Sequence, residues 1–202
     1  MSRSPAGTLS LVGGSLALDF ANTASGRDTA APVERLEEPA HVAEFAAHAG
    51  AVDVGTARRV REVLADDPAG AGVLLRRARQ LREAIYDIGA ALAQGSAPPD
   101  GDLAVLKTYA QKAMAAGVLA RAEHGGYRLD FTSAPVEEAL LGPIAWSAVA
   151  LLADLQPARL KQCPGDGCGF LFLDLSKNAS RRWCDMATCG NRHKGRRHRQ
   201  RR

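Results

Sequence analysis

Aromatic residues are scarce in this chain of 202 residues, which has two Trp, three Tyr and five Phe. Its core must therefore be built mainly from Leu, Val and Ala, a composition that favours helix over strand. Catalytic motifs are lacking as well: there is no phosphate-binding glycine loop, no Gly-x-Ser-x-Gly and no His-Glu-x-x-His. We therefore expect a binding protein and no catalytic residues.

Long hydrophobic runs are also absent. No stretch approaches about 18 uninterrupted apolar residues, the length that a membrane span requires. The apolar stretch 9–20 is interrupted by Gly13, Gly14 and Asp19, and no small-residue cleavage site follows it. We therefore expect a cytoplasmic protein without a membrane partner, in which thiols stay reduced.

The net charge of +4 conceals an uneven distribution. Residues 159–202 contain 12 Lys or Arg and only three acidic residues, whereas residues 1–158 contain 14 basic and 19 acidic residues. An acidic body with a basic tail is typical of a protein whose tail seeks a polyanion. The sequence thus predicts two domains, a mostly helical one at 1–158 and a small module at 159–202.

Helical periodicity dominates the first of these domains. The best signal is an apolar seam at spacings of 4, 3, 4, 3 and 4, which predicts a long helix ending near Gly95, with Leu74, Ala78, Leu81, Ile85, Ile88 and Leu92 on one face. This seam is either a core stripe or a short coiled-coil dimer face, and its length of under three heptads favours the core stripe.

Shorter elements surround this helix. Further helices are expected at 39–49, 54–65, 102–116 and 133–155, with Pro143 kinking or restarting the last. In the helix at 54–65 we expect Val60, Val63 and Leu64 to be buried. Residues 16–20 suggest a short strand or a strand-to-helix entry, 25–39 a loop, and 118–131 a β-hairpin. The expected fold class is mainly α with a small β-sheet (α+β).

Four cysteines, the only ones in the chain, form two C-x4-C pairs separated by fifteen residues: Cys163, Cys168, Cys184 and Cys189. Each short loop can present two thiolates to one point, which suits the tetrahedral geometry and soft ligands of Zn²⁺. Between the pairs, 169–174 should form a strand with Phe170 and Phe172 beside the metal. A segment this small cannot build its own core, so metal binding would supply folding free energy.

Other uses of these cysteines are less consistent with the sequence. Two disulfides would fit the even count but not a reducing compartment. Unligated buried cysteines would not form two matched pairs, and a redox Cys-x-x-Cys site needs a spacing of two residues. Mixed ligation by His193 or His198 stays open.

The end of the chain carries nine cations within 22 residues. If 184–200 is helical, Arg192, Arg196 and Arg199 share one face and could follow phosphates along a groove. A solvated, disordered basic end is the alternative, but the run is joined to the predicted zinc module, in which Trp183 could stack. The candidate nucleic-acid contacts are Arg181, Arg182, Asn191, Arg192, Lys194, Arg196, Arg197 and Arg199.

The segment from Cys184 to Arg192, with its Cys-Gly-Asn-Arg run, resembles the CGNR zinc finger. The upstream pair Cys163 and Cys168 fits the same family, as do the segments 172–174 and 180–183. Residues 18–23 (LDFANT) resemble the opening of the ABATE domain that usually precedes this finger, and 126–127, 143–145 and 159–160 also fit.

This resemblance implies a bacterial transcription regulator, described as stress-induced, whose finger binds zinc and DNA. By position, the four cysteines carry over as zinc ligands, and Gly190, Asn191 and Arg192 carry over as motif residues without individual roles. An RNA-binding protein, or an enzyme that uses the finger to grip a nucleic-acid substrate, is the alternative.

The body would then sense a small-molecule effector or form a homodimer. Asp19 and Asn22 are our candidate ligand-binding residues. A helix-capping or buried hydrogen-bonding role is the more common use of such residues.

Overall fold

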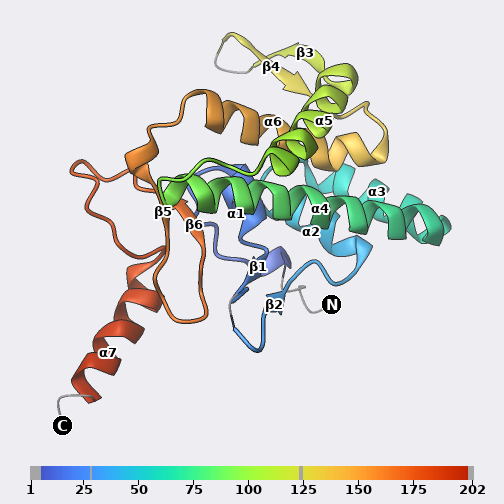
Figure 1. Cartoon of the computed structure of the whole chain (residues 1–202). Coiled ribbons are helices and arrows are strands. Elements are labelled where there is room, and N and C mark those ends of the chain that lie inside the picture. The colour runs from blue at the N-terminus through green and yellow to red at the C-terminus, as the bar shows by residue number, and fades with distance from the viewer. Residues whose placement is uncertain (1–5, 28, 123–124, 200–202) are drawn as a thin grey trace.

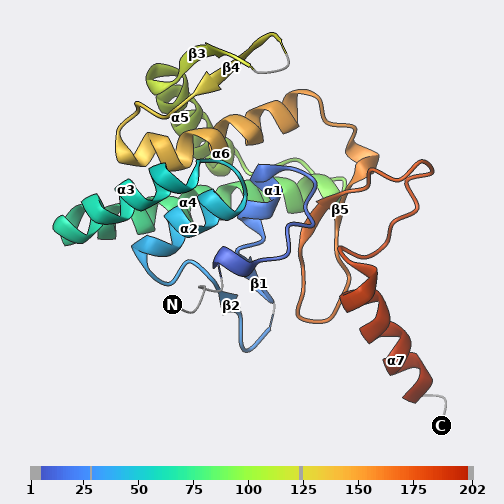
Figure 2. The same ribbon diagram turned by 180° about the vertical axis from the view of Figure 1, so that it is seen from behind.

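The computed structural model describes residues 6–27, 29–122 and 125–199, with side chains up to residue 196 in those ranges. This part of the chain is mostly helical, with three two-stranded antiparallel sheets, so the expected fold class is confirmed. The helices pack into a body, from which the last helix, α7, projects (Figures 1 and 2).

The central element is α4 (Pro68–Ala93), which begins with Pro68 behind the capping side chain of Asp67. Five of the six predicted seam residues are buried and the sixth, Leu92, packs against the same core. Helices α1 (Leu16–Ala21), α2 (Pro39–His48), α3 (Val54–Asp66), α5 (Asp100–Ala116) and α6 (Val136–Ala153) all contact α4. The seam is therefore a core stripe of the body.

Of the two forms that the sequence suggested for residues 16–20, a short strand or a strand-to-helix entry, the strand is wrong and a helix is present. After a 3₁₀ turn (Ala6–Thr8), residues 16–21 form helix α1, which begins where the Ser15 hydroxyl accepts a hydrogen bond from the Leu18 amide. Five of its six residues are buried, so no polar face reveals the helical period. The expected loop at 25–39 is mostly present, with short pairing between β1 (Ala24–Ser25) and β2 (Val33–Glu34).

Helices α2 and α3 lie where the periodicity predicts them. In α3 the side chains of Val60 and Leu64 are buried as expected, but Val63 is 51% exposed. Val63 lies about 100° around the helix from Leu64, beyond the edge of the buried face. Its predicted burial was therefore wrong.

The predicted hairpin is confirmed as β3 (Val118–Arg121) paired with β4 (Tyr127–Asp130). Helix α6 runs through Pro143 without the restart that a proline predicts. By length and composition α6 could cross a membrane, although its first turn carries Glu137 and Glu138. It packs against α5 and α1 and buries Leu140, Leu141 and Ile144, as the core helix of a folded domain does.

The last part of the chain begins with a 3₁₀ turn (Pro157–Arg159) and the hairpin of β5 (Leu160–Gln162) and β6 (Leu171–Leu173). A single π-helical turn (Met186–Gly190) leads into α7 (Asn191–Arg199), which confirms the expected basic helix. Hairpin residues Leu160, Leu171 and Phe172 belong to the same buried cluster as the helices of the body. The boundary between 158 and 159 stays a prediction.

Candidate zinc centre and basic helix

The four cysteines converge at one point between the β5–β6 hairpin and the start of α7. Their sulfur atoms all lie within 4.8 Å of one another, and all four residues are buried. The Sγ atoms of Cys168 and Cys184 are 3.6 Å apart, and those of Cys184 and Cys189 are 3.7 Å apart. A tetrahedron of Zn–S bonds of about 2.3 Å separates its sulfurs by about 3.8 Å. The cluster therefore has the size that a four-cysteine zinc site needs.

The first C-x4-C loop turns tightly because its glycines permit it. Gly167 within the loop and Gly169 directly after it both have a φ of +66°, in the left-handed region that glycine favours. A side chain at Gly165 would begin 3.0 Å from the Cys189 sulfur. The Cys168 amide closes the loop by donating to the Gly165 carbonyl at 2.9 Å. This loop is the tight knuckle that the sequence predicts.

The electrostatics of the cluster call for a cation. Hydrogen bonds from the Cys168 and Cys184 thiols lower the pKa of Cys163 to about 2. The hydrogen bond with Cys163 in turn raises the pKa of Cys168 to about 12, and Cys163 and Cys168 raise that of Cys184 far above its ordinary value. Sulfurs this close cannot all ionise alone, whereas Zn²⁺ compensates four thiolates at once.

The open alternative of histidine ligation finds no support in the described residues. The groups that gather there around one point are the four cysteines alone. The His193 ring packs instead against the Trp183 ring in a tilted arrangement, with ring centroids 4.8 Å apart. His198 lies outside the described side chains. Phe170 and Phe172 are both buried, and Phe170 lines one cavity with Cys168; their expected position beside the metal stays a prediction.

A buried carboxylate organises the long loop between the cysteine pairs. Asp174 is fully buried and accepts hydrogen bonds from Lys161 Nζ at 2.6 Å, from the Ser176 amide and hydroxyl, and from the Arg181 amide. Burial raises its pKa, but these donors outweigh burial and hold the pKa of Asp174 well below its usual range. The loop therefore returns to the cluster at a fixed place.

Asp19 and Asn22 both bond to backbone groups. The Asn22 amide is fully buried and donates to the Leu171 carbonyl at 2.9 Å while accepting from the Leu171 amide at 2.8 Å. The Asp19 carboxylate accepts from the Gly13 amide at 2.7 Å. Burial raises the pKa of Asp19, and bonds from the Gly13 and Val12 amides oppose that rise. In this structure both residues have the buried hydrogen-bonding role, and their assignment as ligand contacts stays a prediction.

Several further residues of the body hold the finger, and sequence reasoning did not single them out for this. The Gly26 amide donates to the Cys168 carbonyl at 3.2 Å, and the Tyr86 hydroxyl donates to the Gly169 carbonyl at 3.2 Å. The Leu173 amide donates to the Gly13 carbonyl at 2.8 Å. No motif marks these positions, because their partners lie far away in the sequence.

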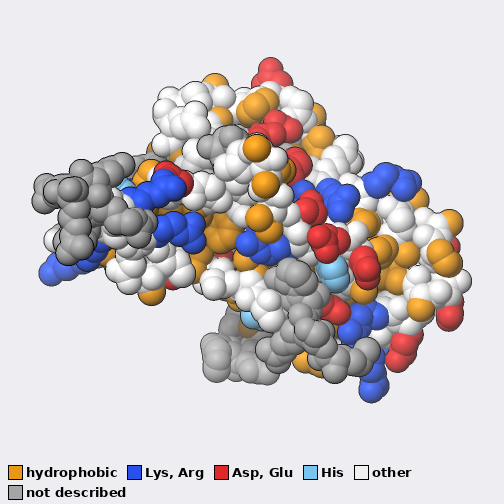
Figure 3. Space-filling model, turned by 90° about the horizontal axis from the view of Figure 1, so that it is seen from below, with side chains coloured by type: hydrophobic (Ala, Val, Ile, Leu, Met, Phe, Trp, Pro, Cys, Tyr) orange, Lys and Arg blue, Asp and Glu red, His pale blue; other side chains and the backbone are white. Residues whose placement is uncertain are grey.

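The candidate nucleic-acid contacts fall into two groups. Arg182, Asn191, Arg192, Lys194 and Arg196 are exposed, and Arg196 pairs with Asp166. Arg181 instead donates to the backbone carbonyls of Val12, Leu173, Trp183 and Cys184, and its guanidinium lies over the Phe172 ring. The side chains of Arg197 and Arg199 lie outside the described residues. Figure 3 shows Lys and Arg side chains at the end that carries α7.

The fold and the site define a class: a zinc-binding protein with a helical body and a four-cysteine finger whose last helix is basic and projecting. Comparison with family models assigns both parts. Residues 14–155 match the ABATE family, described as "Putative stress-induced transcription regulator", and residues 159–202 match the CGNR zinc finger. The chain therefore belongs to the ABATE family and carries a CGNR zinc finger. A comparison with curated proteins finds no match.

Proposed function

We propose that this protein is a zinc-dependent DNA-binding transcription regulator in which α7 enters a groove of the duplex. The observation that carries the proposal is the position of α7, whose first residue lies two positions after the ligand Cys189 and which projects from the body with exposed cations (Figure 1). Family membership alone connects the chain with transcription.

The dimensions of α7 suit the major groove. An α-helix with its side chains is about 10–12 Å across, which fits a groove about 12 Å wide, and the nine residues of α7 would follow about 14 Å of it. Arg192 and Arg196 are four positions apart and share one face, so both could contact phosphates on one strand. Arg182 is exposed beside the helix and lies near the Trp183 ring, at 5.3 Å from its centroid. Arg181 is the exception, since its donors bind backbone carbonyls of the protein, whereas Arg196 has only an exposed ion pair with Asp166 that a phosphate could replace.

Zinc fixes the base of this helix. Cys189 is a ligand, and Gly190 is packed so closely on Met186 that a side chain there would begin 2.3 Å from the Met186 sulfur. Four bonds to one ion therefore determine where α7 begins and in which direction it points. Loss of the ion would leave a basic segment without a fixed orientation.

In this proposal the regulator works on DNA in the cytoplasm and is not an enzyme. The body would act as the sensing or dimerising part. An RNA target is the competing outcome, since zinc modules also bind RNA.

Binding of duplex DNA and of structured RNA, measured by fluorescence anisotropy at several salt concentrations, tests the proposal. Tighter binding of the duplex is expected, with Arg192→Ala plus Arg196→Ala lowering the salt slope by about two counterions. The matched control is Arg76→Ala plus Arg121→Ala, which removes two exposed arginines of the body and should leave the slope unchanged. An unchanged slope in the α7 variant would remove both residues from the contact surface.

The zinc requirement needs a separate variant. Cys184→Ser should lose the metal and the affinity for DNA while the far-ultraviolet circular dichroism of the helical body persists. Full affinity in metal-free Cys184→Ser would mean that the basic residues bind without the finger.

A further inference from the structure

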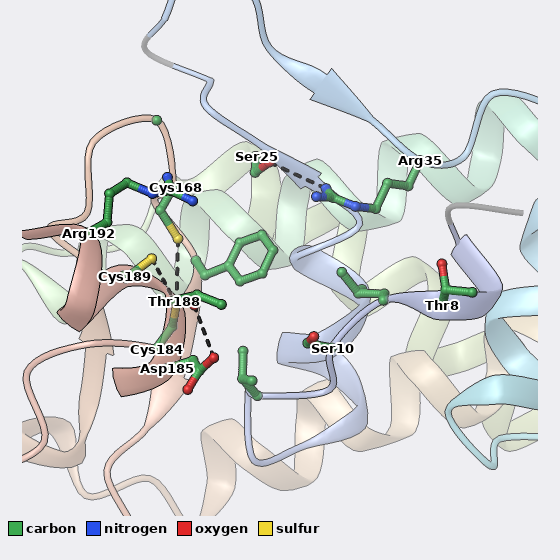
Figure 4. Close-up of a pocket in the computed structure, with 14 residues that line it drawn as sticks. Thr8, Ser10, Ser25, Arg35, Cys168, Cys184, Asp185, Thr188, Cys189 and Arg192 are labelled. Carbon is green, nitrogen blue, oxygen red and sulfur yellow. Dashed lines mark hydrogen bonds between the residues drawn. The ribbon is translucent and has the colours of Figure 1, made fainter.

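A cavity of about 390 Å³ lies where the N-terminal segment, β1 and the finger meet. Figure 4 shows its two ends: Arg35 and Ser25 of the body stand on one side, and Cys168, Cys189 and Arg192 of the finger stand on the other. Leu9, Val12 and Phe170 supply apolar lining. Of the proposed DNA contacts of α7, Arg192 lines the finger end of this cavity, whereas the Arg35 end belongs to the body.

Arg35 is the unusual side chain of this cavity. It is half-buried and makes no ion pair among the described residues; its hydrogen bond to Ser25 Oγ is 3.3 Å long. Its guanidinium also lies 5.8 Å from the Phe170 ring centroid. Nearby arginines are paired, because Arg82 binds Glu34 with two hydrogen bonds and Arg27 binds Glu83. A half-buried guanidinium with one long hydrogen bond keeps donors from which a bound anion could accept.

The acidic groups near Arg35 are already engaged. The Glu34 carboxylate is bound by Arg82 and Arg79. Asp185 on the cavity wall accepts from the Ala187 amide and the Thr188 hydroxyl, each at 3.0 Å. Neither carboxylate pairs with Arg35, so its guanidinium keeps donors that no described carboxylate uses.

We propose that the Arg35 end of this cavity binds a phosphate group. The guanidinium offers a planar pair of donors that matches phosphate oxygens, and the hydroxyls of Ser10 and Ser25 lie on the same cavity. A zinc tetrathiolate would carry a net negative charge, so the phosphate is expected at the body end, away from the cysteines and from Arg192, which stands beside them.

Two sources could supply this phosphate. One is the backbone of the nucleic acid, in which case the inference rests on the proposed function and extends the DNA contacts from α7 to the body. The other is a free phosphorylated ligand, which would occupy the junction between body and finger. Both require the same chemistry at Arg35, and two measurements separate them.

The first measurement is a titration of the zinc-loaded, ¹⁵N-labelled protein with inorganic phosphate at constant ionic strength. We expect a saturable shift of the Arg35 Nε–H signal and no comparable shift of Arg76, an exposed arginine of α4. The signal is assigned with Arg35→Lys, which keeps the positive charge. The titration itself uses the unmutated protein, and only the assignment needs folded Arg35→Lys.

The second measurement is the salt slope of duplex binding by Arg35→Gln, with Arg76→Gln as the matched control. Zinc content and circular dichroism are checked first. A slope lower by about one counterion for Arg35→Gln alone identifies a backbone phosphate. A saturable shift with an unchanged slope identifies a free phosphorylated ligand.

Absence of both effects would overturn the inference while leaving DNA binding by α7 intact. If the unmutated protein does not bind duplex at all, the proposed function fails, and the phosphate titration alone decides this site.

Discussion

Asn22→Ala tests how firmly the body holds the finger. Asn22 is fully buried in the turn after α1, and its amide makes two hydrogen bonds to Leu171, 149 residues away in the sequence. Alanine removes both partners and leaves one amide and one carbonyl of the buried β6 strand unsatisfied. Each orphaned group costs about 1–3 kcal/mol, so we expect unfolding free energy to fall by about 2–6 kcal/mol.

Urea unfolding of the zinc-loaded protein at 25 °C, followed by Trp fluorescence and circular dichroism, measures this change. For a chain of this size the melting temperature should fall by roughly 4 °C at the least. The matched control is Asn178→Ala, because Asn178 is exposed and its side chain makes no hydrogen bond to the described residues. That variant should stay within about 0.5 kcal/mol of the unmutated protein.

Zinc retention in the same variant gives an independent result. Because Leu171 lies on the strand after the first cysteine pair, loss of its anchor should speed removal of zinc by a chelator. A loss of unfolding free energy below about 1 kcal/mol, with unchanged zinc release, would refute the view that Asn22 joins the two parts.

Three further outcomes follow from the structure. Gly89→Ala would place a Cβ 2.6 Å from a Leu171 methyl group, so it should lower the unfolding free energy by about 1–3 kcal/mol. Gly101→Ala is the control, because the space around Gly101 is open and the substitution should not destabilise the protein. Equal melting temperatures of the two variants would contradict the close packing of Gly89 on Leu171. Chelation should release one zinc and expose four thiols to a thiol reagent, and reactive thiols before chelation would speak against the site. Burial raises the pKa of Glu34, but its bonds to arginine outweigh burial and lower the pKa below 4.5. Ionised Glu34 therefore stabilises the fold above about pH 4.5, and this stabilisation is lost as the pH falls through the lower pKa of the folded state. Glu34→Gln should flatten that acid limb of an unfolding titration, and an unchanged limb would assign the loss to other carboxylates.

Local sequence patterns were sufficient for much of the fold. The seam of α4 repeats over five intervals, and one face of a long helix must be buried, so the pattern and the burial agree. The hairpin of β3 and β4 follows from two short apolar runs around a turn. The two C-x4-C pairs predicted a common metal because cysteine spacing within a loop constrains where its thiols can point.

Only the tertiary structure decided what depends on distant partners. Residues 16–21 are a helix although their burial on nearly all sides conceals the helical period. Arg181 and Arg192 look alike in the sequence. The Arg181 guanidinium, however, donates hydrogen bonds to the backbone carbonyls of four residues, whereas Arg192 is exposed. Asn22 joins the body to the finger across 149 residues. Sequence fixes which groups a chain offers and their local periodicity, and only packing determines which of those groups meet.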